Sequence, residues 1–428
     1  MNISELKRAA AWAVAGLVGT GAFGEEDGAV GVRAGADLRV RQEAFDDIPV
    51  KGGGVTRGGL NDSIRFRVRG WAGLDWGVLS ADVRVADEMR AWVDGPGGWE
   101  WPDEVVVDQL QLRAGLGDWG TVTAGRQDMK LGTGRLWADG TPKDGSRTGY
   151  FDGVRWHGEA GAWKVDAAGV YTEAENHLAT GHEHRDVTGY AGGFNGMAEG
   201  GVGVFAERRE EGKSGYGGYG IWKHDTAWRT AQGERVEGED IWTLGLRWMP
   251  RLGERTSADM EAALQWGDSD GRDRFGSFAA GGLKQEWGDG GWWGVGGVHM
   301  SGDKEGSEKR EDFNILFGRW PWISELMILA YDGDGVGTWN NLAGCWLEGG
   351  WKFGEKHDVR GTAGPLWAEE ANGSGGGHER GWLGTARYGF PLWKGAEGHL
   401  LGEVLFPGDY YDSRTTAYFL RWEISCRF

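Results

Sequence analysis

The chain has 428 residues, including 82 glycines and 27 tryptophans, and a formal net charge of −19. Two cysteines exclude a disulfide-stabilised scaffold and a cysteine-rich zinc protein. An aromatic content of 12% argues against disorder. A mean hydropathy of −0.50 excludes a membrane protein built from helices, because each span needs about 20 consecutive apolar residues. The acidic balance also argues against a nucleic-acid partner.

The first 24 residues have the pattern of a secretory signal. Lys7 and Arg8 precede an apolar run from Ala9 to Val18, and small residues follow as far as Gly24. A basic segment, a short apolar segment and an A-x-G cleavage site are the parts of such a signal. The run is too short to span a bilayer, and the alternative is an N-terminal helix packed on a core. We therefore predict a signal peptide over residues 1–24 and a single domain over residues 25–428.

Alternation of apolar and polar residues dominates the chain after the signal. It occurs in residues 30–41, 64–76, 79–85, 109–114, 163–171, 242–248, 260–266, 343–352 and 418–428. A period of two is that of a β-strand with one apolar and one polar face. No amphipathic helix of a dozen residues and no change of composition interrupts the pattern. The sequence predicts an all-β domain.

Alternating strands of nine to eleven residues are typical of a transmembrane antiparallel β-barrel. About 22 residues for each strand and its connection give about 18 strands, in the range of porins. Apolar residues would then face lipid and charged residues would face water inside. Tryptophans at strand ends would form girdles at the membrane surfaces: Trp71, Trp76, Trp242, Trp248, Trp266, Trp292 and Trp293. The alternative is a soluble β-sandwich, propeller or solenoid with shorter strands.

The last predicted strand runs to the final residue, Phe428. Tyr418, Trp422, Ile424 and Cys426 share its face. A terminal aromatic residue on an alternating strand resembles the assembly signal of Gram-negative outer-membrane barrels. We therefore expect a location in the outer membrane of a Gram-negative bacterium. The expected partners are its lipid and lipopolysaccharide, and the barrel assembly machinery through the Phe428 strand.

Five segments resemble those of alginate-export-type outer-membrane proteins. They are residues 125–127 (GRQ), 131–136 (LGTGRL), 149–155 (GYFDGVR), 317–326 (FGRWPWISEL) and the C-terminal region 399–428. The resemblance implies an 18-stranded monomeric barrel that passes an anionic polysaccharide through an arginine-lined pore. One departure is the net charge of −19, much of it in predicted loops, because acidic loops would repel a polyuronate.

Arginines are the candidate pore-lining residues. Most lie on the polar face of their strand, whereas Arg126 falls on the face of Val122 and Ala124, so that its lumenal place rests on the resemblance. The candidates are Arg39, Arg65, Arg67, Arg69, Arg84, Arg113, Arg126, Arg135, Arg155, Arg319 and Arg421. Two interpretations stay open. The arginines form a basic lining for an anion, or they pair with inward Asp and Glu residues and brace the barrel.

The predicted function is passive passage of a hydrophilic solute, a saccharide or an organic anion, through a water-filled lumen. The alternatives are a general diffusion porin, an outer-membrane barrel enzyme and a structural barrel. No G-x-S-x-G or H-E-x-x-H motif is present, so we predict no catalytic residue, metal or cofactor. His177, His182 and His184 lie close together, and we interpret them as part of a solvated loop and not as metal ligands.

Overall fold

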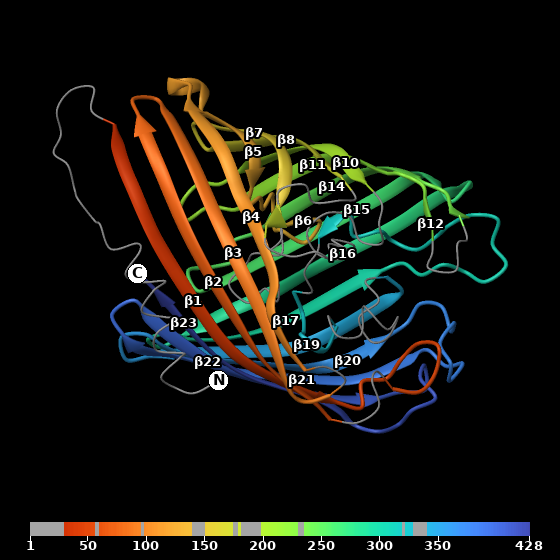
Figure 1. The fold of residues 1–428 in the computed structure, drawn as a ribbon. Coiled ribbons are helices and arrows are strands. Elements are labelled where there is room, and N and C mark those ends of the chain that lie inside the picture. Colours follow the sequence, from red (N-terminus) through yellow and green to blue (C-terminus); the bar gives the residue numbers. More distant parts are fainter. Residues whose placement is uncertain are drawn as a thin grey trace.

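A closed barrel of 18 antiparallel strands forms the molecule (Figure 1). The computed structural model describes residues 30–55, 60–95, 98–138, 150–173, 179–180, 198–229, 235–318, 322–327 and 340–428. The last strand, β23 (Ala417–Arg427), pairs with the first, β1 (Gly31–Asp46), so the sheet has no open edge at the seam. The predicted fold class, an antiparallel β-barrel of about 18 strands, is confirmed. The signal-peptide prediction falls outside the described residues.

The other barrel strands follow one another around the ring, each paired with its neighbours. They are β2 (Asn61–Trp76), β3 (Leu79–Asp94), β4 (Trp99–Gly115), β5 (Thr121–Gln127), β7 (Phe151–Ala160), β8 (Trp163–Thr172), β10 (Glu199–Arg208), β11 (Gly215–Asp225), β14 (Glu239–Met249), β15 (Thr256–Ser269), β16 (Arg272–Trp287), β17 (Gly291–Met300), β19 (Leu342–Phe353), β20 (His357–Trp367), β21 (Glu379–Trp393) and β22 (Ala396–Pro407).

Short elements lie in the connections. They are the 3-10 helix η1 (Gly117–Trp119) and the two-residue strands β6 (Trp137–Ala138), β9 (Ala179–Thr180), β12 (Trp228–Arg229), β13 (Arg235–Val236) and β18 (Phe317–Gly318). Within the described ranges, no helix is long and apolar enough to cross a membrane.

The two ends of the barrel differ in the length of their connections. At one end a two-residue turn, Gly77 and Val78, joins β2 to β3; at the other end residues 301–341 join β17 to β19. Short turns of outer-membrane barrels face the periplasm and long connections face outside. We therefore call the end with short turns the periplasmic end and the other the outer end. Gly31 of β1 and Arg427 of β23 lie at the periplasmic end.

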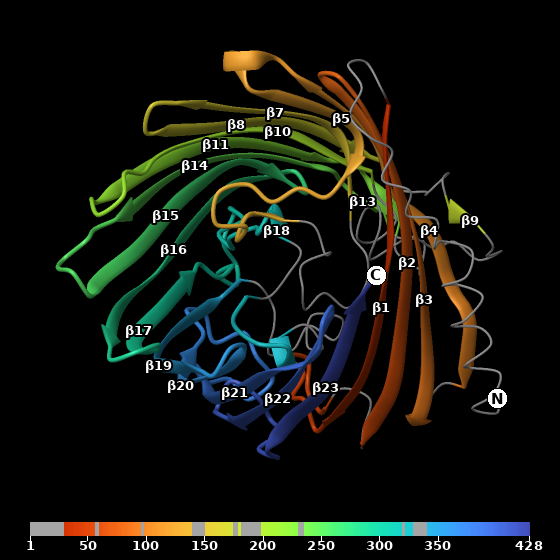
Figure 2. The same ribbon diagram turned by 90° about the vertical axis from the view of Figure 1, so that its left-hand side faces the viewer.

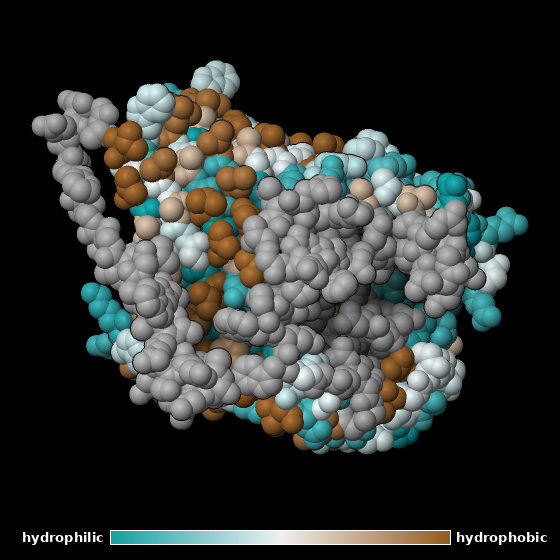
Figure 3. Space-filling model, viewed as in Figure 1, coloured by the Kyte–Doolittle hydropathy of each residue, from teal (hydrophilic) through white to brown (hydrophobic). Residues whose placement is uncertain are grey.

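The outer surface of the strands is apolar. On β14, the side chains of Leu244 and Leu246 are 58% and 69% exposed, whereas Thr243, the residue before Leu244, is 3% exposed. Hydrophobic residues, in brown, are frequent on the visible upper part of β1 to β4 in Figure 3, among paler and hydrophilic ones. Such a belt on a closed barrel is stable only against hydrocarbon, because water would be in contact with a large apolar surface. The protein is an outer-membrane barrel.

Five of the seven predicted girdle tryptophans lie on this outer face: Trp76, Trp242, Trp248, Trp266 and Trp293. The prediction is wrong for Trp71 and Trp292. Adjacent residues of a strand point to opposite faces, so Trp292 cannot share a face with Trp293. The rings of Trp71 and Trp292 lie inside the barrel against the bare backbones of Gly35 and Gly350 on neighbouring strands.

We expect Leu244→Arg to destabilise the barrel folded in lipid. The free energy of unfolding should fall by about 2–4 kcal/mol, the cost of an arginine near the bilayer midplane. Trp248→Arg on the same strand is the matched control, because an arginine near the membrane surface costs only about 0–1 kcal/mol. Folding into lipid vesicles over a urea series measures both. Equal stability of the two variants would contradict the placement of Leu244 near the bilayer midplane and of Trp248 near the membrane surface.

Candidate pore constriction and arginine wall

Two connections at the outer end fold back into the barrel. One comprises residues 128–138 after β5, and the other comprises residues 311–318 and 322–327 between β17 and β19. They meet where β6 pairs in parallel with β18. Figure 2 shows this meeting point within the ring of strands. We call these segments the inner loops. The sequence alone did not reveal whether a loop enters the lumen.

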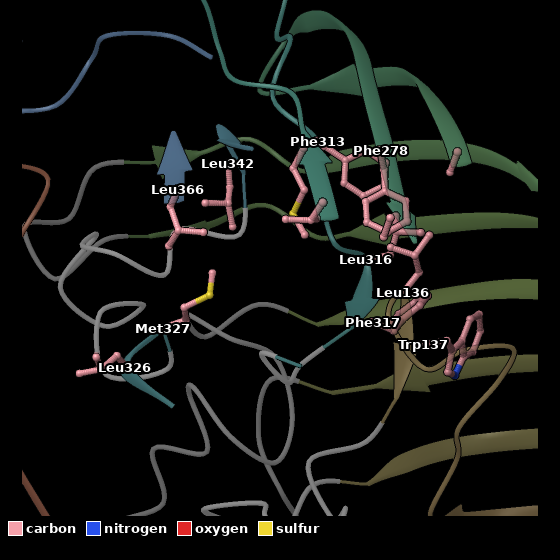
Figure 4. Packing of buried hydrophobic residues seen from close by; sticks show 14 of the residues in the cluster. Leu136, Trp137, Phe278, Phe313, Leu316, Phe317, Leu326, Met327, Leu342 and Leu366 are labelled. Carbon is pink, nitrogen blue, oxygen red and sulfur yellow. The ribbon is translucent and has the colours of Figure 1, made fainter. Parts of the chain in front are cut away.

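Aromatic rings join the inner loops to each other and to the wall. The Trp137 and Phe317 rings are 4.4 Å apart between centroids, and both side chains are fully buried. Both pack on β10, where a Cβ added at Gly201 or Gly203 would come within 2.8 Å of a ring atom. Figure 4 shows these rings among Leu136, Leu316 and other buried side chains. Glycine on β10 therefore allows the inner loops to lie directly against the wall.

Carboxylates fix the end of the second inner loop to the opposite wall. Glu403 on β22 accepts hydrogen bonds from the Ser324 hydroxyl at 2.6 Å and from the backbone N–H groups of Glu325 and Leu326 at 3.0 and 2.9 Å. Arg421 on β23 donates to Glu43 at 2.6 Å and to Glu325 at 2.8 Å. One arginine thus connects β1, β23 and the inner loop.

Glu325 sits in an unfavourable place for a charge. Burial raises the pKa of its carboxyl group to about 7, and the neighbouring Glu403 and Glu43 carboxylates act in the same direction. Arg421 opposes the shift through its ion pair and hydrogen bond. Between about pH 4.5 and about pH 7, the docked Glu325 therefore keeps a proton that a solvated glutamate releases.

Arginines crowd one side of the lumen, on β1, β2 and β23. We call this set the arginine wall: Arg39, Arg41, Arg65, Arg67, Arg69 and Arg421, with the carboxylates Asp37, Glu43, Glu88 and Glu423. Arg69 binds Asp37 at 2.9 Å, while Arg39 and Glu88 are 3.8 Å apart. Six guanidinium groups face these four carboxylates and the carboxyl group of Glu325, which pairs with Arg421 at 2.8 Å. Among the described residues, Nε and Nη1 of Arg67 and Nη1 of Arg69 are buried without a hydrogen-bond partner.

Nine of the eleven predicted arginines have a carboxylate within 4.0 Å. They are Arg39, Arg65, Arg67, Arg69 and Arg421 in the arginine wall, and Arg84, Arg126, Arg135 and Arg155 elsewhere. Arg113 is exposed near the periplasmic end, and Arg319 lies outside the described residues. The pairing favours the bracing interpretation, and the excess of arginine in the wall favours the anion interpretation. That these side chains line a conducting path stays a prediction.

Arg126 shows why its strand pattern was misleading. Gly125 has a φ of 111°, in the region that favours glycine, and it breaks the alternation, so Arg126 and Gln127 are both buried. The Arg126 guanidinium stacks on Tyr150 at 3.7 Å and binds Asp152 at 2.8 Å.

The candidate list omitted Arg41, Glu325 and Glu403. The alternation places Arg41 on the polar face of its strand with Arg39, so the sequence pattern does identify it. The pattern does not identify Glu325 and Glu403, because their roles depend on contacts between an inner loop and distant strands. His177, His182 and His184 lie outside the described residues, and the described part of the chain holds no group of three His, Cys, Asp or Glu residues suited to a metal ion.

Comparison with known proteins identifies the fold. No protein-family model and no curated protein sequence gives a significant match. The chain resembles the structure of Pseudomonas aeruginosa OccK3 (OpdO) at 12% identity and a TM-score of 0.58, over 92% of this chain and 95% of that one. A BenF-like porin from Pseudomonas fluorescens Pf-5 matches at 12% identity and a TM-score of 0.58, over 92% of this chain and 98% of that one. P. aeruginosa OpdK, solved with vanillate, matches at 13% identity and a TM-score of 0.55, over 92% of this chain and 98% of that one.

The resemblance to alginate-export-type proteins is wrong. The solved structures that the chain resembles are porins of the OpdO, OpdK and BenF-like kind, and no family model matches. Two of the segments that suggested it have a structural explanation, because residues 131–136, 317–318 and 322–326 belong to the inner loops. Gly132 and Gly134 adopt φ values of 57° and 80°, which the reversal of the first inner loop requires.

We expect Gly203→Val to displace Trp137 and increase single-channel conductance. Overpacking costs about 1–3 kcal/mol, and an inner loop moves more easily than a barrel strand. Gly220→Val is the control, since a Cβ there meets nothing within 4 Å. Planar-bilayer recordings compare the two variants. Unchanged conductance in both would show that Trp137 does not narrow the pore.

We expect the docking of the second inner loop to weaken as pH rises from about 4.5 to about 7. The docked Glu325 holds its proton up to about 7, whereas a released one loses it near 4.5. The difference corresponds to about 3 kcal/mol above pH 7. Current fluctuations should therefore be more frequent at pH 8 than at pH 5, and Glu325→Gln should remove the difference. Identical noise at both pH values in the unmodified protein would refute this.

Proposed function

We propose that the protein is a passive channel for small hydrophilic anions, with organic carboxylates as the favoured class. The arginine wall carries this proposal: six guanidinium groups face four wall carboxylates and Glu325, and within the described part of the chain donors of Arg67 and Arg69 have no partner. Charge on one side of a water-filled lumen with low-dielectric walls concentrates counter-ions and lowers the barrier for one sign of charge.

The inner loops support a small solute. They narrow the lumen with rings and aliphatic side chains from both connections, which favours a single sugar acid or aromatic acid over a polymer. OpdK was solved with vanillate, an acid whose negative charge is of the sign that the arginine wall would attract. A saccharide without a negative charge gains nothing from this wall.

A general diffusion porin is the second candidate, and the ion pairing of the arginines favours it. Arg84 binds both Asp108 and Asp128 at 2.8 Å, and Arg155 binds Asp166 at 2.5 Å. Such pairs brace the barrel and leave little net charge for selection. The two candidates differ in ion selectivity, which is measurable.

Delivery to the outer membrane follows the sequence expectations. In this proposal residues 1–24 direct export, and the assembly machinery binds the Phe428 strand. Phe428 supports the second point: it is 59% exposed, and its backbone N–H and C=O pair with Ala36 on β1, at the seam between the first and last strands. Lipid and lipopolysaccharide would cover the apolar outer belt.

We expect a reversal potential of anion-selective sign when the reconstituted barrel separates two concentrations of KCl. Arg67→Ala should reduce this potential because it removes a charge with free donors from the arginine wall. Lys309→Ala, which removes the same charge from an exposed outer connection, should change it less. A cation-selective potential in the unmodified protein would reject the anion channel and leave the general porin.

A further inference from the structure

Two neighbouring turns at the periplasmic end carry exposed apolar side chains. They are the turn between β2 and β3 and the connection between β4 and β5, which contains η1. We call their apolar residues and those beside them the turn patch: Trp76, Val78, Leu79, Leu116 and Trp119, which are 45–78% exposed. The backbone N–H of Gly115 donates to the C=O of Val78 at 2.8 Å, so the two turns are joined. Figure 1 shows both turns at its upper edge.

Other turns at this end differ in composition. Charged side chains occupy the five that follow β10, β14, β16, β19 and β21, and these include Arg209, Lys213, Arg251, Asp289, Glu355 and Lys394. In the two turns of the turn patch, residues 77–78 and 116–120, the one charged residue is Asp118. The five charged turns suit water, whereas the turn patch leaves apolar surface uncovered.

The backbone of the turn patch is held in place. The indole N–H of Trp156 on β7 donates to the C=O of Trp119 at 2.8 Å. A Cβ at Gly120 would clash with the C=O of His157, so this connection lies directly against β7. Gly117 has a φ of 61°, which other residues adopt only with strain. The Trp119 side chain therefore stays exposed unless something outside the chain covers it.

The turn patch continues the apolar outer belt without a break. Trp76 and Leu79 are paired across β2 and β3, and the next pair on the outer face is Leu74 and Ala81. Ala81 is paired in turn with Leu112 of β4, which is 66% exposed. Since lipid covers the belt, the same lipid reaches the edge of the turn patch.

The exposed apolar length of β3 is short. It runs from Val78 in the turn to Val85, which is eight residues. Met89 and Ala91, farther along the same face, are only 6% and 3% exposed. A tilted strand needs about 9–11 residues to cross the hydrocarbon. The turn therefore belongs to the length that lipid covers on this side of the barrel.

We propose that the turn patch inserts into the periplasmic leaflet of the outer membrane. Trp76 and Trp119 lie at the boundary between acyl chains and headgroups, where tryptophan is enriched, and Asp118 stays among the headgroups. Interfacial tryptophans act as anchors that help to set tilt. The barrel is tilted, so that the turns of β2–β5 reach lipid while the turn with Asp289 stays in water. That turn joins β16 to β17, on the opposite side of the 18-strand ring.

Fluorescent labels on single cysteines test this placement. Cys345 and Cys426 are replaced by alanine, and one cysteine is introduced as Val78→Cys, Trp119→Cys or, for the matched control, Asp289→Cys. Each carries nitrobenzoxadiazole, and the barrel is reconstituted in phosphatidylcholine vesicles. A lipid with a nitroxide near its headgroup should quench the labels at positions 78 and 119 several-fold more strongly than the label at position 289. Iodide in the water should give the reverse order.

Three other results would overturn the proposal, whatever the ion selectivity of the channel. Equal quenching by iodide at positions 119 and 289 would place the turn patch in water. Protection of positions 78 and 119 from both quenchers would show that protein covers the patch, for example a second copy of the chain. Equal quenching by the lipid at all three positions would exclude the tilt. Val78→Cys keeps both tryptophans, so it decides if Trp119→Cys does not fold.

Discussion

Hydrocarbon offers no hydrogen-bond partner, and this constraint governs the whole molecule. Every backbone group in the wall must pair with a neighbouring strand, so the sheet closes through β1 and β23. Closure leaves two environments for side chains, lipid outside and the lumen inside. Leucine, valine and tryptophan cover the first. The charged residues of the strands therefore gather in the second, at a density that makes pairing between them unavoidable.

The arginine wall follows from that density. Arg39, Arg41 and Arg65 are buried, and a buried charge is tolerated only beside an opposite one. Glu43, Glu88 and Glu423 supply the opposite charges. Because these carboxylates and Glu325 together are fewer than the six guanidinium groups, positive charge remains on this side. Bracing and anion attraction are therefore two results of one arrangement.

The sequence was informative wherever a local period decided the outcome. Leu244 and Thr243 took the predicted faces, and the strand count was correct, because alternation is written into neighbouring residues. Prediction failed where a single residue interrupted the alternation, or where contacts with residues distant in the sequence determined the position of a side chain. Gly125 turned Arg126 inward through its positive φ, and the partners of Glu325 come from β22 and β23. The glycine-rich and aromatic segments suggested a wrong family, because the folding of an inner loop demands the same residue types.

Arg421 has a consequence for how the channel is built. It binds Glu43, 378 positions away on the first strand, and Glu325, 96 positions away in the inner loop. The contact with Glu43 cannot exist until the last strand has reached the first. Contacts at such separations form late, since the intervening chain must be ordered beforehand. Closing the seam therefore adds a link from the first strand to the arginine that holds the inner loop, so that the loop is tied to both sides of the seam only in the closed barrel.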